Sequence, residues 1–184
     1  MSEERASVLV VDDEENITAL FEAWLSTEYD VKVANSGAEA LEQMDETVDV
    51  VLLDRRMPTV SGDELLEEMR DRGCEARVAM VTAIDPDFDV LDMGFDDYLT
   101  KPVSREDLEE VVEALHDRTS YDDDVQRYYA LAAKKAALET SKPASELAES
   151  EQYQALLDDL DEVEEDLDGQ LSVEEDFVSA FRDL

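Results

Sequence analysis

Short β-rich runs alternate with amphipathic helical patterns through the first 118 residues, and this alternation restricts the fold more than any other feature of the chain. Apolar residues spaced three and four positions apart mark the helices. Two of the runs, Val8–Val11 and Val50–Leu53, are continuously apolar, as expected of parallel strands covered on both faces. Five such units predict one doubly wound α/β domain with a parallel sheet. The expected strands are Ser7–Val11, Asp30–Ala34, Val48–Leu53, Ala76–Val81 and Asp96–Thr100.

Capping residues mark the ends of the helices in this region. A serine followed three positions later by an acid is typical of a helix start, because each side chain accepts a hydrogen bond from the other residue's backbone N–H. Gly73 is expected to end the third helix. The helix before the fifth strand is expected to start with Asp85 as its cap, with Pro86 next, and to reach Gly94 after about two turns. The serine–acid pairs are Ser36/Glu39, Ser61/Glu64 and Ser104/Asp107.

The chain beyond Arg118 has helical patterns without strand signals. This change divides the whole protein into an α/β region, residues 1–118, and a small all-α region, residues 119–184. Breaks between the expected helices come from proline, glycine and serine. The helices are expected over 121–140, 143–167 and 173–184, with breaks at Ser141–Pro143 and Asp168–Gly169 and a cap formed by Ser172 and Glu175.

An apolar stripe follows one side of the middle helix of this region. Its residues step by three and four positions, which is the spacing of a coiled coil. The stripe is only about two heptads long, so an intramolecular hairpin with helix 121–140 explains it as well as a dimer does. We favour the hairpin. The stripe consists of Tyr153, Leu156, Leu160, Val163 and Leu167.

The chain is strongly acidic. It has 52 acidic residues against 15 lysines and arginines, a net charge of −37, and the excess is spread over both parts of the chain. At molar salt the Debye length falls to about 3 Å, so the repulsion among these charges is largely screened. We therefore expect a cytosol of high salt concentration; the alternative is an acidic protein from an ordinary cell.

The sequence also indicates a cytoplasmic protein. Cys74 is the single cysteine, so no intramolecular disulfide can form and a reducing compartment fits. No apolar run approaches the roughly 20 residues that cross a membrane. The first residues, MSEERAS, lack the basic and then apolar layout of a signal peptide.

Charged and polar residues follow four of the expected strands at the point where each strand ends. Asp12 and Asp13 follow the first strand, Asp54 the third and Lys101 the fifth, and Thr82 closes the fourth. Ligands of open parallel sheets bind outside the carboxyl ends of the strands, where the strand order reverses. With the strand order 2-1-3-4-5, the aspartates of the first and third strands face each other at that point.

Three ionised carboxylates at one place repel one another, and a divalent cation removes this conflict. Mg²⁺ binds a few carboxylates, a carbonyl and retained waters. Such a site favours transfer of a phosphoryl group onto a carboxylate, with Lys101 and the Thr82 hydroxyl available to bind its oxygens. Each residue alone has an ordinary explanation as a helix cap, a strand residue or a solvated lysine. Their meeting at one sheet edge favours a phosphorylation switch with Asp54 as the acceptor.

The stretches VLVVDDEENI, VVLLDRRMP, MVTA and DDYLTKPV resemble those of response regulator receiver domains of two-component signalling. The resemblance covers residues 1–118 and implies a flavodoxin-like fold. It also implies a protein that is not an enzyme beyond slow self-catalysed phosphorylation and dephosphorylation. Phosphorylation of Asp54 would come from a cognate sensor histidine kinase.

The same resemblance implies roles for individual residues. Mg²⁺, or Mn²⁺, would be bound by Asp13, Asp54 and the backbone carbonyl of Arg56, with Asp12 acting partly through water. Thr82 and Tyr98 correspond to the switch pair of the family, and Lys101 to its phosphoryl-binding lysine. A cis bond is expected between Lys101 and Pro102.

The sequence departs from the family pattern at two places. Thr82 and Lys101 lie 19 positions apart, roughly three fewer than in the family and close to one helical turn. The shortened helix between them argues against dimerisation in the family's usual manner. Arg56 and Ile84 occupy the positions that flank the approach of water in the family, so they are expected to tune hydrolysis of the phosphoryl group.

The region 119–184 resembles the HalX-type helical domain that follows receivers in regulators of halophilic archaea. The resemblance implies no settled activity, and we expect this region to bind a protein partner or to self-associate. The alternative is a transcription regulator that binds DNA through these helices. DNA binding requires a positive surface, whereas this region is acidic, so no nucleic-acid-binding residues are assigned.

A local group of basic residues is the exception. Packing against the acidic stretch 158–168 is the simpler explanation of these residues, and nucleic-acid contact is the other. The group consists of Arg127, Lys134, Lys135 and Lys142, interrupted by Glu139.

Enzymatic functions fit the sequence less well. The five glycines are scattered rather than gathered in a phosphate-binding loop. A phosphatase with an aspartate nucleophile would need a second carboxylate at the position of Arg56. The only histidine, His116, lies late in the helix after the fifth strand, where the helix dipole favours a cation.

Overall fold

The computed structural model describes residues 5–118 and 123–171. Its centre is a five-stranded parallel sheet with the order β2-β1-β3-β4-β5, as predicted. Each strand bound lies within two residues of the predicted one. The strands are β1 (Ser7–Val11), β2 (Asp30–Ala34), β3 (Val50–Leu53), β4 (Arg77–Thr82) and β5 (Asp97–Thr100).

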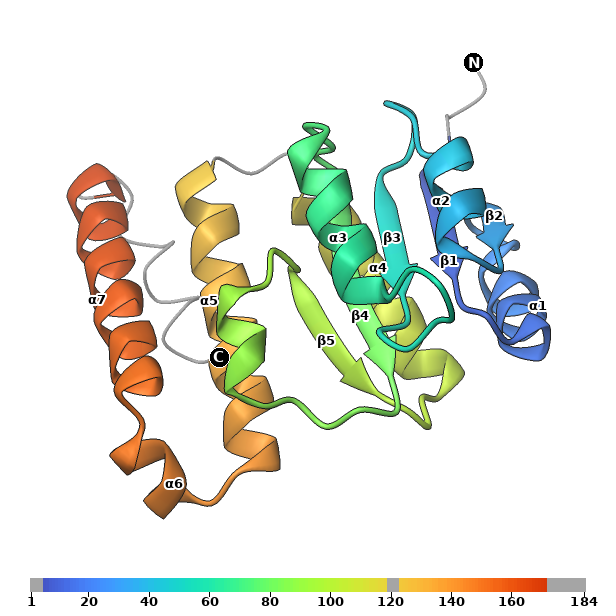
Figure 1. The fold of residues 1–184 in the computed structure, drawn as a ribbon. Coiled ribbons are helices and arrows are strands. Elements are labelled where there is room, and N and C mark those ends of the chain that lie inside the picture. The colour runs from blue at the N-terminus through green and yellow to red at the C-terminus, as the bar shows by residue number, and fades with distance from the viewer. Residues whose placement is uncertain (1–4, 119–122, 172–184) are drawn as a thin grey trace.

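Helices follow the strands and then continue alone (Figure 1). The predicted caps of α2 and α3 are present: the Ser36 hydroxyl accepts the Glu39 N–H, and Ser61 with Glu64 forms a full capping box. Gly73 ends α3 with φ 78°, as expected of a C-terminal glycine. The helices are α1 (Glu15–Leu25), α2 (Gly37–Gln43), α3 (Gly62–Asp71), the 3₁₀ helix η1 (Phe88–Asp92), α4 (Arg105–Arg118), α5 (Asp123–Ser141), α6 (Ala144–Glu149) and α7 (Glu151–Leu171).

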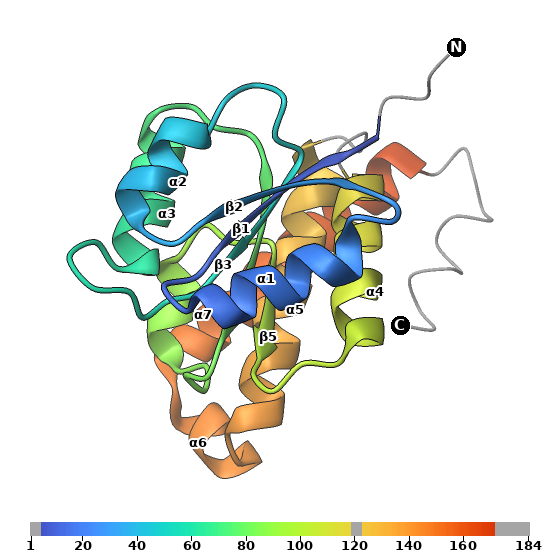
Figure 2. The same ribbon diagram turned by 90° about the vertical axis from the view of Figure 1, so that its right-hand side faces the viewer.

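The sheet is covered on both faces (Figure 2). Helices α1 and α4 lie on one face, where Phe21 and Leu108 belong to the same buried cluster as Val10 and Val50. Helices α2 and α3 lie on the other face with η1. Burial on both sides explains why the central strands are continuously apolar.

The connection between β4 and β5 differs from the prediction. The helix there is a five-residue 3₁₀ helix, shorter than the two turns expected, and its cap is Asp87 rather than Asp85. The Asp87 carboxylate accepts the N–H of Phe88, so the helix starts two residues later than Pro86 suggested. A helix this short covers little of the sheet beside β5.

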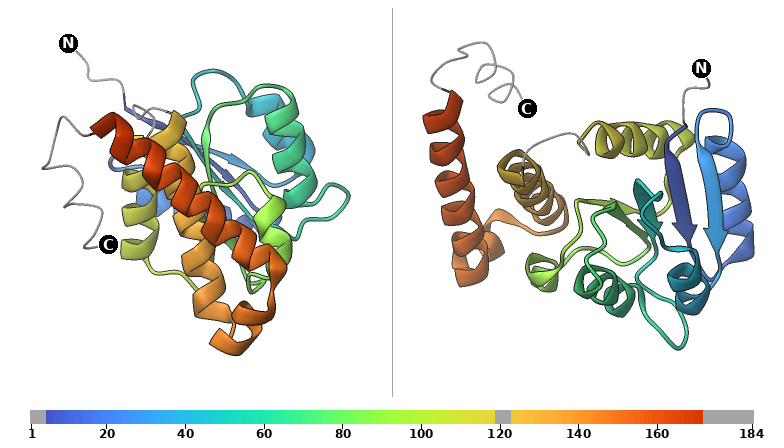
Figure 3. Two further views of the ribbon diagram at one scale, coloured as in Figure 1. Left: turned by 90° about the vertical axis from the view of Figure 1, so that its left-hand side faces the viewer. Right: turned by 90° about the horizontal axis from the view of Figure 1, so that it is seen from above.

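The C-terminal helices fill that position. Helix α5 lies beside β5 and η1, and α7 runs antiparallel to α5 as the outermost layer (Figures 1 and 3). Leu138 of α5 and Tyr153 of α7 belong to the same buried cluster as Val90 and Phe95. The predicted hairpin is therefore present, and it shares one core with the sheet.

Two predicted boundaries in this region are wrong. The middle helix is divided at Ser150, whose extended backbone ends α6 and whose hydroxyl accepts the Tyr153 N–H at the start of α7. Helix α7 then continues to Leu171 through the break expected at Asp168–Gly169. The predicted helix 173–184 lies outside the described residues.

Across residues 5–118 and 123–171, none of the helices combines the length and apolarity that a membrane span requires.

Candidate functional site

The predicted site residues meet at the carboxyl edge of the sheet. Hydrogen bonds of the strand ladders extend beyond the strand ends and fix these residues in register. The Asp54 N–H donates to the Val11 carbonyl at 3.0 Å, and the Lys101 N–H donates to the Thr82 carbonyl at 2.7 Å. The peptide bond between Lys101 and Pro102 is cis, as expected.

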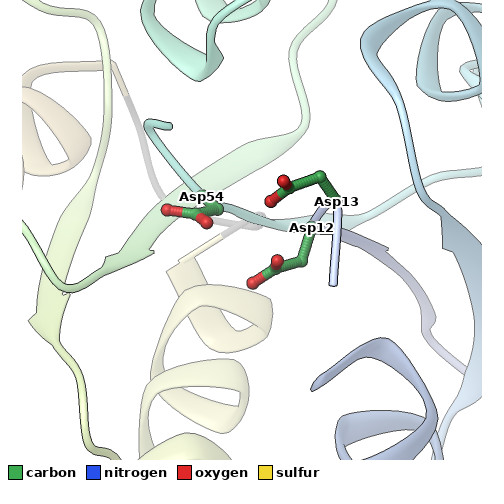
Figure 4. Close-up of side chains that lie close together, drawn as sticks. All are labelled: Asp12, Asp13 and Asp54. Atoms are coloured by element: carbon green, nitrogen blue, oxygen red, sulfur yellow. The ribbon is translucent and has the colours of Figure 1, made fainter. Parts of the chain in front are cut away.

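Three carboxylates from two neighbouring strands gather at this edge (Figure 4). Asp12, Asp13 and Asp54 each offer an oxygen, and these oxygens all lie within 4.8 Å of one another. Asp12 and Asp54 are 2% and 7% exposed, whereas Asp13 is open to solvent. Such a set of oxygen donors, partly buried and partly accessible, fits a hard divalent cation.

Lys101 provides a positive charge inside this group. Its Nζ lies 2.5 Å from Asp12 Oδ2 and 3.5 Å from Asp54 Oδ2. Burial lowers the pKa of Lys101, but the hydrogen bond that Lys101 donates to Asp12 and the charges of Asp12 and Asp54 outweigh it, so that the pKa is raised. Lys101 therefore stays charged and partly offsets the repulsion among the carboxylates.

Asp12 is held by a residue that the sequence did not single out. The Asn35 amide donates to the Asp12 carbonyl at 3.0 Å and to the Thr18 hydroxyl at 3.0 Å. The Asp12 carboxylate also accepts the Glu14 N–H at 2.9 Å. The sequence did contain a signal for Asn35, because it is a polar residue directly after the second strand. That strand ends at the same edge of the sheet as the strand before Asp12.

The predicted switch pair meets at one backbone segment. The buried Thr82 hydroxyl accepts the Ile84 N–H at 3.3 Å, and the Tyr98 hydroxyl donates to the Ile84 carbonyl at 2.6 Å. The Tyr98 ring is buried against Phe95, with 5.6 Å between centroids. Ile84 thus connects Thr82 to Tyr98.

Arg55, the neighbour of Arg56 to which the sequence analysis assigned no role, is buried beside Asp54. Its guanidinium, 6% exposed, makes two hydrogen bonds of 2.9 Å to Asp63 and one of 2.7 Å to Asp89. It also lies 3.5 Å from the Tyr98 hydroxyl. The hydrogen bonds to Asp63 are the largest cause that raises the pKa of Arg55 above its ordinary value. The available signal in the sequence was a basic residue two positions after a buried strand.

The other predicted positions have varied surroundings. Arg56 is exposed, and its N–H lies 3.4 Å from Asp54 Oδ1, while Ile84 is half-buried. The role of the Arg56 carbonyl stays a prediction. His116 lies in the last turn of α4, as expected.

Two of the four basic residues, Lys134 of α5 and Lys142 directly after it, do not pack as predicted. Lys134, 8% exposed, donates to the Met93 carbonyl at 2.6 Å and to the Leu91 carbonyl at 3.3 Å. Lys142 pairs with Asp87 at 3.0 Å. These partners belong to the connection between β4 and β5, not to the acidic stretch 158–168. Lys134 supplies a donor to backbone carbonyls at the end of η1, which have no partner within the helix.

Comparison with known proteins identifies two families along the chain. The response regulator receiver domain matches residues 8–113, and the HalX domain matches residues 117–181. A putative transcriptional regulator of Haloferax volcanii is 50% identical over 153 residues, which are 81% of this chain and 26% of that protein. The alkaline phosphatase synthesis regulatory protein PhoP of Bacillus subtilis is 38% identical over 59% of this chain and 47% of its own length.

Solved structures agree with the match to the receiver domain. The receiver domain of the Francisella response regulator 1452 has a TM-score of 0.58 and 32% identity, and covers 63% of this chain and 100% of its own. The BeF₃-activated DrrB receiver domain has a TM-score of 0.57 and 32% identity over 62% of this chain and 99% of its own. The chain spans about a quarter to a half of the curated relatives above. It belongs to the response regulator receiver family, and a HalX domain follows its receiver domain.

Proposed function

We propose that this protein is a cytoplasmic response regulator of a two-component system, in which Asp54 accepts a phosphoryl group from a cognate sensor histidine kinase. The observation that carries the proposal is the meeting of Asp12, Asp13 and Asp54 with Lys101 at one sheet edge. Structural explanations of the single residues do not account for three carboxylates and a lysine in one place.

In the proposed reaction, a carboxylate oxygen of Asp54 forms the new bond to phosphorus while the bond from phosphorus to the donor nitrogen breaks. Asp13, Asp54 and the Arg56 carbonyl would hold Mg²⁺ or Mn²⁺, with Asp12 acting partly through water. When bound, the cation neutralises charge on the phosphoryl oxygens. Lys101 would turn from Asp12 to a phosphoryl oxygen.

The new charge must find further donors, and phosphorylation adds up to about two negative charges. The Thr82 hydroxyl would move toward the phosphoryl group and would draw Ile84 with it. Since the Tyr98 hydroxyl donates to the Ile84 carbonyl, the position of the Tyr98 ring depends on this movement.

Loss of the phosphoryl group is proposed to be slow and self-catalysed, with Arg56 and Ile84 tuning the access of water. Arg56→Ala is expected to change the dephosphorylation rate more than Arg72→Ala does, measured by intact mass after removal of the donor. Arg72 is a suitable control because it is exposed and pairs with Glu68. Arg70 is unsuitable because its guanidinium donates to carbonyls of Gly94, Cys74 and Ala76. Equal rates in the two variants would refute a role for Arg56.

Residues 119–184 are proposed to be the output region, which acts through a protein partner or self-association. The acidic outer side of α7 is unsuited to DNA, and Lys134 and Lys142 are engaged within the chain. DNA binding is the second candidate, because the Haloferax volcanii relative is named a putative transcriptional regulator. Specific, salt-tolerant DNA binding by the full chain would favour that candidate.

The proposed function is tested by phosphoryl uptake. The purified protein is incubated in high KCl and Mg²⁺ with acetyl phosphate, and intact mass is followed beside Asp54→Ala. One added phosphoryl group is expected on the wild type alone, and none without a divalent cation. A folded wild type that takes up no phosphoryl group and binds no Mg²⁺ would contradict the proposal.

A further inference from the structure

Residues 83–96, which connect β4 to β5 and include η1, are held from two sides; we name them the switch loop. One side faces the phosphorylation site, since Thr82 directly precedes the loop. The other side faces α5. The switch loop is therefore the segment through which the proposed phosphorylation site and the C-terminal hairpin can influence each other.

Arg55 holds the loop from the side of the acceptor. It follows Asp54 in the chain, and its buried guanidinium contacts Asp89 in η1 at 2.7 Å. The same guanidinium lies 3.5 Å from the Tyr98 hydroxyl, which in turn donates to the Ile84 carbonyl. Two bonds to Asp63 fix the guanidinium to the start of α3. Arg55 thus links the first part of the loop, near Ile84, to η1.

Helix α5 and Lys142, the residue directly after it, hold the loop from the opposite side at three places. The Ser141 hydroxyl donates to the Pro86 carbonyl at 2.9 Å. Lys142 pairs with Asp87 at 3.0 Å and lies 4.7 Å from the centroid of the Phe88 ring. At the other end of η1, Lys134 donates to the Met93 and Leu91 carbonyls. All of these contacts depend on the position of η1.

We propose that Arg55 is a positioning residue that couples phosphorylation of Asp54 to the docking of α5 through the switch loop. The inference rests on the proposed function. Movement of Thr82 and Ile84 toward the phosphoryl group displaces the loop, and the contact between Arg55 and Asp89 carries the displacement to η1. The carbonyls and the Asp87 carboxylate then leave the donors of α5, so docking weakens. Because coupling between two sites is reciprocal, weaker docking also favours phosphorylation.

The test measures backbone hydrogen exchange of residues 130–142 in the full chain, with and without Mg²⁺ and acetyl phosphate, while intact mass reports phosphoryl uptake. Asp89→Asn and Arg55→Gln break the link on its two sides. Asp89→Asn is the milder change, because the Asp89 side chain is 58% exposed and Arg55 keeps Asp63. Glu68→Gln is the matched control, since it breaks an exposed ion pair with Arg72.

In the wild type, phosphorylation is expected to raise exchange in this segment about tenfold. The rise should persist in Glu68→Gln and should fall below about twofold in Asp89→Asn and Arg55→Gln, although both still take up the phosphoryl group. An unchanged rise of exchange in those two variants, or no rise in phosphorylated wild type, would overturn this inference and leave the proposed function standing. A wild type that takes up no phosphoryl group at Asp54 would overturn the proposed function itself. The intact-mass measurement reveals that outcome, whereas hydrogen exchange reports only on the docking of α5.

Discussion

Gly62 lies where the start of α3 meets the backbone of Asp54, the proposed acceptor, and replacing it by alanine should disturb both stability and phosphorylation. A Cβ at this position would lie 2.0 Å from the Asp54 carbonyl oxygen and 2.8 Å from the Arg55 Cα. Both atoms belong to the backbone, so no side chain can turn away. The start of α3 would have to move by about 1 Å to reach even the closest contact that real Cβ atoms show.

The cost has two parts. A forced backbone shift in a packed region costs about 1–3 kcal/mol. The hydrogen bond from the Gly62 N–H to the Arg55 carbonyl, 2.8 Å long, contributes about 1 kcal/mol. The better helix propensity of alanine offsets up to about 1 kcal/mol. We expect a loss of about 2–3 kcal/mol in the free energy of unfolding, a large fraction of the roughly 5–15 kcal/mol of a typical domain.

The measurement is urea unfolding in high KCl followed by far-UV circular dichroism, with a midpoint expected about 1–2 M lower for Gly62→Ala. Gly94→Ala is the control, because the nearest atom to its Cβ would be the Arg70 Cγ at an ordinary 3.4 Å. Its unfolding free energy should change by less than about 0.5 kcal/mol. Phosphoryl uptake by Asp54 should be slower than in the wild type in Gly62→Ala but not in Gly94→Ala. Equal midpoints for the two variants would refute the argument from close approach.

Three further predictions concern strain, pH and salt. Thr59 has φ 71°, which is unfavourable for a β-branched residue, so Thr59→Gly should raise the unfolding free energy by about 1 kcal/mol; a lower urea midpoint would contradict this. Burial and the hydrogen bond to Glu139 raise the pKa of Tyr153 from 10.0 to about 12. The folded state therefore keeps this proton longer, and stability should be lost between about pH 10 and 12. Tyr153→Phe should lose less over that window in urea titrations at several pH values, and equal losses would count against the Tyr153 assignment. At a net charge of −37, lowering KCl from about 1 M to 0.1 M lengthens the Debye length from about 3 to 10 Å. The thermal midpoint should fall, and an unchanged midpoint would contradict the adaptation to salt.

The sequence by itself determined the sheet and the place of the site. Continuously apolar runs such as Val50–Leu53 fix strands buried on both faces, and parallel strands bring their carboxyl ends to one edge. Asp12 and Asp54 had to meet there whatever the details of the loops. The serine–acid caps such as Ser61 with Glu64 were equally local, because both partners lie within one turn.

Only the tertiary structure decided how the rest of the chain surrounds that edge. Arg55 and Asp89 are 34 positions apart and Lys134 and Met93 are 41 positions apart, and no local pattern pairs them. The short η1 leaves room beside β5, and α5 fills it, which sends Lys134 and Lys142 to the switch loop rather than to the acidic helix α7. A sequence shows that a basic side chain needs an acceptor. Which of many equivalent carbonyls and carboxylates it reaches depends on how the helices pack.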